Sequence, residues 1–110
     1  MANAGTDEDA DVAIRCRVLT LLYAGNTSSN FAEMIGVSPT RWNNVEHSGA
    51  LSRDMAFKIV RRFPEISLDW LWRGKDDGLT RAKGDELAAA FKTLAAERAP
   101  RQPKRKRAAG

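Results

Sequence analysis

Cysteine and histidine are almost absent from this chain of 110 residues, which contains one of each, Cys16 and His47. A single cysteine excludes a disulfide within the chain, and it indicates a reducing compartment. Metal sites built from cysteine and histidine need several such ligands, so we expect neither a metal nor another cofactor. No nucleophile stands at a motif spacing from His47 and the adjacent Glu46, so we do not expect an enzyme. Glu46 is expected to make a structural hydrogen bond or ion pair instead.

Long apolar runs and strand patterns are missing as well. No run comes near the ~20 apolar residues that a membrane span needs. The first eleven residues, MANAGTDEDAD, have neither the basic nor the apolar region of a secretory signal. No segment alternates apolar and polar residues between turns, as a strand would. We therefore expect an all-α protein in the cytoplasm, with no membrane partner.

Charge is distributed unevenly along the chain. The net charge is +4, and five of the basic residues lie within the last eleven positions. Subtracting these five charges from +4 leaves −1 for the rest of the chain. The tail at 99–110 has two prolines, a basic run and no apolar pattern, so we expect it to be disordered. The first ten residues are small and acidic and are expected to form a flexible arm.

Apolar residues recur at helical spacing through the middle of the chain. Ser38 followed by Pro39 is a strong helix start, and Gly36 suits the left-handed residue that ends the preceding helix. Ser52 and Ser67 are expected to cap two further helices. The predicted helices cover about 11–24, 28–35, 39–47, 53–63, 68–73 and 85–98, with a linker at 75–84.

The spacing also predicts which side chains face inward. The first helix carries an apolar stripe at i, i+4, i+7 and i+8, made of Ile14, Val18, Leu21 and Leu22. Arg15 and Arg17 are expected to point away from this stripe. In the third helix, Trp42 and Val45 lie three residues apart and are expected to face the core.

Residues 27–49 form the pattern of two short helices joined by a tight turn, which is the shape of a helix-turn-helix. Residues 12–74 resemble the lambda-repressor-like DNA-binding family, also described as Cro/C1-type or XRE-type, which is a bundle of five short helices. The resemblance rests on Phe31-Ala32, Gly36-Val37-Ser38, Trp42, Glu46, Gly49 and the segment ISLDWLWRG at 66–74.

The resemblance implies a sequence-specific transcriptional regulator of the repressor type that binds double-stranded DNA as a homodimer. Its half-sites would lie about 34 Å apart. The chain would then divide into an acidic arm (1–10), a DNA-binding domain (11–74), a linker (75–84), an extra C-terminal helix (85–98) and a disordered basic tail (99–110). When bound to DNA, the protein would be associated with the nucleoid.

The resemblance assigns roles to exposed side chains of the third helix and its surroundings. The expected base contacts are Thr40, Arg41 and Asn44. The expected phosphate contacts are Ser28, Ser29, Asn43 and Arg53. The tail would add sequence-independent affinity through Lys104, Arg105, Lys106 and Arg107. Relatives often carry glutamine where this chain has Ser28, so the target sequence stays open.

The C-terminal part leaves two alternatives open. The apolar side chains of the last helix either dock on the bundle or pair with a second copy, and we favour pairing. The residues expected at that dimer surface are Trp72, Leu87, Phe91 and Leu94. A different function would use the same region, because an antitoxin-like or anti-activator module would bind a protein partner through the fifth helix and the C-terminal helix.

Overall fold

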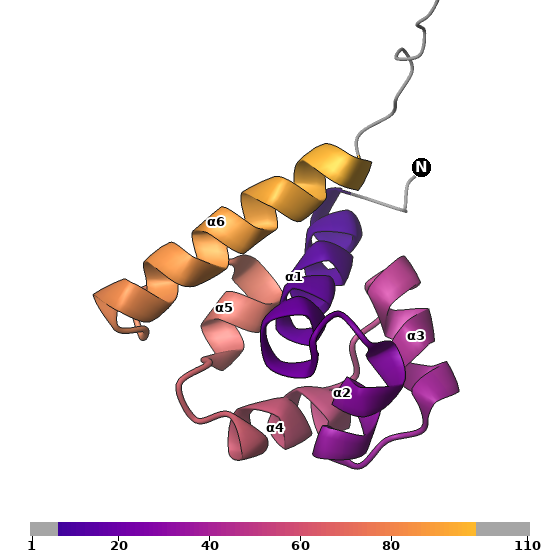
Figure 1. Cartoon of the computed structure of the whole chain (residues 1–110). Helices are drawn as coiled ribbons and strands as arrows, with labels where there is room; N and C mark the ends of the chain where they lie inside the picture. Colours follow the sequence, from indigo (N-terminus) through magenta and orange to yellow (C-terminus); the bar gives the residue numbers. More distant parts are fainter. Residues whose placement is uncertain (1–6, 99–110) are drawn as a thin grey trace, which may run out of the picture.

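The computed structural model describes residues 7–98, which form six α-helices and no strand (Figure 1). None of these helices combines the length and the hydrophobicity of a membrane span. The helices are α1 (Asp7–Ala24), α2 (Ser28–Ile35), α3 (Pro39–Ser48), α4 (Arg53–Arg62), α5 (Leu68–Arg73) and α6 (Arg81–Arg98).

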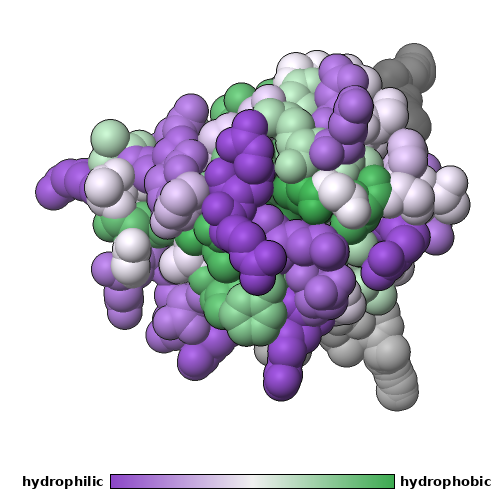
Figure 2. Space-filling view, turned by 90° about the horizontal axis from the view of Figure 1, so that it is seen from below, coloured by the Kyte–Doolittle hydropathy of each residue, from purple (hydrophilic) through white to green (hydrophobic). Residues whose placement is uncertain are grey.

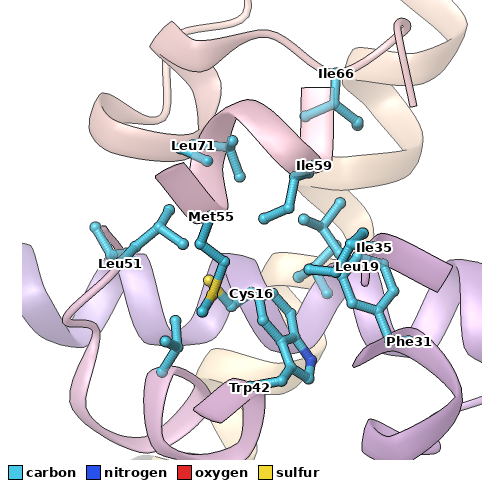
Figure 3. Close-up of a cluster of buried hydrophobic side chains, with 14 of the residues drawn as sticks. Cys16, Leu19, Phe31, Ile35, Trp42, Leu51, Met55, Ile59, Ile66 and Leu71 are labelled. Carbon is cyan, nitrogen blue, oxygen red and sulfur yellow. The ribbon is translucent and has the colours of Figure 1, made fainter. Parts of the chain in front are cut away.

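The first helix is the centre of the bundle. It contacts α2, α3, α5 and α6, while α4 closes the bundle by packing on α2 and α5. In Figure 1, α6 lies across one end of the molecule and α2 and α4 lie at the other. Figure 3 shows side chains from α1 to α5 converging on a single core, among them Leu19, Phe31, Trp42, Met55 and Leu71.

Helix ends follow the local sequence closely. The hydroxyls of Ser38, Ser52 and Ser67 each accept a hydrogen bond from the backbone N–H three residues later, at 3.0–3.2 Å. These three serines are the N-caps of α3, α4 and α5, as predicted. Gly36 ends α2 in the left-handed region, with φ 80°, which is also as predicted.

The first and the last helix both begin earlier than predicted. The first helix begins at Asp7 rather than near residue 11, so the predicted arm at 1–10 is too long. The last helix begins at Arg81, which shortens the predicted linker at 75–84. The hydroxyl of Thr80 accepts a hydrogen bond from the Lys83 N–H at 3.1 Å, and this cap explains the early start.

The last helix docks on the bundle of its own chain. Leu87 and Leu94 are 0% and 5% exposed and belong to the core cluster. The prediction that these two side chains pair with a second copy is therefore wrong, because α6 packs directly on α1. Trp72 and Phe91, the other residues expected at a dimer surface, are half-buried, whereas Trp70 is buried.

Arg15 is buried beneath the end of α5, so the prediction that it points away from the core is wrong. Its Nε donates to the carbonyl of Leu71 at 3.0 Å, and its Nη2 donates to the carbonyl of Trp72 at 3.2 Å. The last carbonyls of a helix have no partner within it, and a cation there is favoured by the helix dipole. Arg15 thus fastens α5 to α1.

A substitution of Gly74 tests the contact between Arg15 and α5, because a side chain at this position would meet the guanidinium. Gly36 and Gly74 both have positive φ, so alanine at either costs about 1–2 kcal/mol. A Cβ on Gly36 would touch nothing within 4 Å, whereas a Cβ on Gly74 would lie 2.9 Å from Nη1 of Arg15. We expect Gly74→Ala to lose at least about 1.5 kcal/mol more than Gly36→Ala in urea unfolding, because hydrogen bonds from a charged donor are disturbed. Equal losses would show that Arg15 does not fasten α5.

Candidate nucleic-acid interface

A tight turn of three residues, Gly36–Ser38, joins α2 to α3. The N–H groups of Gly36 and Val37 both donate to the carbonyl of Ala32, at 2.9 and 3.0 Å. Ser38 then caps α3, and Pro39 occupies the first turn of that helix. These bonds define the direction in which α3 leaves α2, because both ends of the turn are held by backbone or cap interactions.

The inner side of α3 is packed into the core. Trp42 is fully buried, and Val45 is 5% exposed. The ring of Trp42 lies against Phe31 of α2, with 4.6 Å between the ring centroids. Trp42 is therefore a core residue, as the sequence predicted, and α3 is held against α2 by an aromatic contact.

Glu46 carries a carboxylate that is buried between three helices, with only 4% of the residue exposed. Its Oε1 accepts a hydrogen bond from the Ser28 hydroxyl of α2, and its Oε2 accepts one from the Thr20 hydroxyl of α1, both at 2.5 Å. The Thr20 oxygen in turn accepts a hydrogen bond from Nε1 of Trp42 at 2.8 Å. This buried network, defined by Ser28, Thr20, Glu46 and Trp42, ties α3 to both α1 and α2.

The network confirms the structural hydrogen bond expected of Glu46 and adds partners that the sequence did not reveal. Thr20 was not singled out, although it is the one polar residue in the run VLTLL of an otherwise apolar stretch. Ser28 was expected to contact phosphate, but it is half-buried and its hydroxyl donates to Glu46. Because the hydroxyl proton of Ser28 is donated to Glu46, only the backbone N–H of Ser28 is left to donate to a phosphate.

The outer side of α3 exposes a row of polar side chains. These are Thr40, Arg41, Asn43, Asn44 and His47. Arg41 and Asn44 line a shared hollow of about 190 Å³ between α3 and the start of α4, and Ser52 lies on its other side. The structure thus brings together two of the three predicted base contacts, whereas Thr40 is exposed outside this hollow. Ser52 was predicted only as a cap.

Two of the remaining predicted phosphate contacts, Ser29 and Arg53, lie at helix starts, and the third, Asn43, lies on α3 itself. Ser29 is exposed in the first turn of α2, and Arg53 is exposed as the first residue of α4. Asn43 is exposed on α3, and its carbonyl lies 2.8 Å from Nδ1 of His47. The predicted tail contacts, Lys104 to Arg107, lie outside the described residues.

Positive charge gathers on α4, beside the α2–α3 unit. Lys58, Arg61 and Arg62 surround a hollow of about 300 Å³ whose other walls are Met34 and Ile35 of α2. Figure 2 views the molecule from the end where α2 and α4 lie, and hydrophilic side chains cover most of this face with small hydrophobic patches between them. The sequence prediction did not assign a role to these three cations.

The thiol of Cys16 is unreactive. It is fully buried, and burial together with the negative charge of Glu46 raises the pKa of its thiol far above the ordinary value. A thiol that stays protonated at neutral pH is neither a nucleophile nor a metal ligand. Within residues 7–98 the structure contains no group of three or more histidine, cysteine, aspartate or glutamate side chains that is arranged to hold a metal.

Comparisons of this chain with protein-family models, with curated proteins and with solved structures give no match.

The buried network predicts a specific loss of stability. Thr20→Val keeps the shape of the side chain but leaves both Nε1 of Trp42 and one oxygen of Glu46 without the Thr20 hydroxyl. Because a buried N–H without a partner costs about 1–3 kcal/mol and a hydrogen bond to a charged group contributes about 1.5–3 kcal/mol, we expect a loss of ~2–5 kcal/mol in urea unfolding. Thr20→Ser, which keeps the hydroxyl and removes one methyl, serves as the control and should lose about 1 kcal/mol. If the valine variant is as stable as the serine variant, the network does not stabilise the fold.

Proposed function

We propose that this protein binds double-stranded DNA in a sequence-specific manner, with α3 as the recognition helix, and that it acts as a transcriptional regulator of the repressor type. One observation carries the proposal. The inner side of α3 is fixed by the core and by the buried network, while its outer side presents Arg41 and Asn44 together at one hollow. A rigid helix with an exposed polar row is what direct readout in the major groove requires.

The chemistry of the outer row suits base recognition. The guanidinium of Arg41 can donate two hydrogen bonds to guanine, and the amide of Asn44 can pair with two positions of adenine. Both residues are exposed and lie three positions apart, so they share one face of α3. Thr40, one turn before Asn44, is placed to touch a thymine methyl or a phosphate.

Helix starts around α3 supply the phosphate contacts of the proposal. The N-cap of α2, Thr27, makes no side-chain cap bond, so N–H groups of the first turn remain available to a phosphate. The exposed hydroxyl of Ser29 lies in the same turn, and exposed Arg53 opens α4 on the other side of α3. The basic side chains of α4 add attraction that does not depend on base sequence.

Regulation would follow from occupancy of an operator in the nucleoid. The described domain is a small helical bundle, and repression by competition with polymerase needs nothing beyond tight binding at the right place. A homodimer on a two-fold operator would place two copies of α3 one helical turn of DNA apart. Since Leu87 and Leu94 are used within the chain, the half-buried Trp72 and Phe91 are the predicted dimer residues that remain.

The alternative function, a protein-interaction module on the same fold, would have little exposed apolar surface for binding a partner. It would use α5 and α6, but Trp70, Leu87 and Leu94 are buried in the core of the single chain. A gel shift at low salt with DNA from the protein's own promoter region separates the two functions, because an interaction module would leave the DNA unshifted.

Base reading by α3 is tested by comparing how much each substitution weakens binding to a selected DNA site and to random DNA. Binding sites are first selected from random duplex DNA, and affinities are then measured by fluorescence anisotropy at one salt concentration. We expect Arg41→Ala and Asn44→Ala each to cost ~1–3 kcal/mol at the selected site and much less on random DNA, because base contacts are made only at the cognate sequence. Lys92→Ala removes an exposed cation from α6 and serves as the control. Equal losses on both DNAs would contradict base reading by α3.

A further inference from the structure

Another hollow, of about 220 Å³, lies between the end of α5 and α6, on the opposite side of α1 from the α2–α3 unit (Figure 1). Its walls are mostly apolar, from Trp70 of α5 and from Leu87 and Phe91 of α6. The guanidinium of Arg15 and the carboxylate of Asp76 are its charged groups. Pockets for small molecules combine apolar walls with a few placed polar groups, and this hollow lies just below their usual ~300–1,000 Å³.

Among residues 7–98, Arg15 makes no direct ion pair, although the charge of Asp11, one turn earlier on α1, acts on its guanidinium. Arg15 is only 6% exposed, and its two hydrogen bonds go to neutral carbonyl oxygens of α5. Within residues 7–98 the ion pairs closer than 4.0 Å are Lys58–Asp54 and Lys83–Glu86, so no carboxylate reaches Arg15. Buried arginine is rare without a paired charge. A carboxylate in the hollow would make the direct ionic contact that Arg15 lacks among these residues.

Arg15 lines this hollow, and part of its guanidinium has no hydrogen-bond partner among the described residues. An arginine side chain has five N–H groups, and the Nε and Nη2 bonds to α5 use two of them. Nη1 makes no hydrogen bond to the described residues and lies 2.9 Å from the position that a Cβ on Gly74 would take. Gly74 also lines the hollow, and it has no side chain to lie between the hollow and the guanidinium. The end formed by Nη1 and Nη2 is the edge that binds a carboxylate with two parallel hydrogen bonds.

We propose that this hollow binds a small organic carboxylate. Its two oxygens accept hydrogen bonds from the free end of Arg15, and its apolar body lies against Trp70, Leu87 and Phe91. Asp76, on the same rim, disfavours ligands that carry further negative charge and selects monocarboxylates. The bound molecule touches α1, α5 and α6 together, so it holds α6 on the bundle. This inference does not depend on DNA binding, and its test contains no DNA.

The experiment uses the full chain labelled with ¹⁵N, and phenylacetate as the probe. Its uncharged isostere, 2-phenylacetamide, is the matched ligand control, and inorganic phosphate is the control for a plain anion site. We expect phenylacetate to shift the indole N–H resonance of Trp70 and the Nε–H resonance of Arg15 in a saturable way. The amide should bind at least tenfold more weakly, because a neutral ligand does not pair with the guanidinium.

Three substitutions of exposed residues keep the test independent of folding. Ala88 lines the hollow and Ala89 does not, although both are exposed on α6. Ala88→Trp should abolish binding of phenylacetate, while Ala89→Trp should leave it within twofold of the unmodified chain. Asp76→Asn should tighten binding several-fold, because it removes a negative charge beside the carboxylate. Unsaturable shifts, equal binding of the amide or of phosphate, or binding that persists in Ala88→Trp would each overturn the proposal.

Discussion

The carboxylate of Glu46 is the interaction on which the arrangement of the first three helices depends. A buried carboxylate costs several kcal/mol in lost hydration unless hydrogen-bond donors replace the water. Its donors include two hydroxyls from different helices, Ser28 of α2 and Thr20 of α1. Since both hydroxyls reach Glu46 together only when α1, α2 and α3 are all in place, the network favours one arrangement of these helices over other compact ones.

Arg15 is a second buried charged residue, and it binds α5 to the other side of α1. Arg15 lies on α1, as Thr20 does, and it satisfies the last carbonyls of α5. The first helix therefore carries one polar anchor for the predicted reading unit and another for the C-terminal helices. In Figure 1, α1 runs through the middle of the molecule between these two parts. This division keeps the outer row of α3 apart from the hollow that Arg15 lines.

Features set by neighbouring residues were predictable from the sequence, whereas features set by distant partners were not. The caps at Ser38, Ser52 and Ser67 depend on an N–H three residues away, so local sequence was sufficient. Thr20 and Arg15 are buried because α3, α5 and α6 surround α1 on most sides. A single apolar stripe does not describe such a central helix, which explains why Arg15 was placed outside.

The docking of α6 on its own chain is another feature that depends on distant partners and was not predictable from local sequence. Its apolar spacing was recognised, but spacing does not say whether the partner surface belongs to the same chain or to a second copy. The exposed row on α3 was predictable for the opposite reason, because Trp42 and Val45 fix the orientation of the helix and leave Arg41 and Asn44 outside.

We propose that the outer side of α3 reads DNA and that Glu46 holds α3 in place for this. The most direct test is an NMR titration of the ¹⁵N-labelled chain with a duplex obtained by selection from random DNA. We predict the largest shifts at backbone and side-chain amides of the first turn of α2 and of residues 40–44, and small shifts along α6. Shifts concentrated on α5 and α6, or none at low salt, would contradict it.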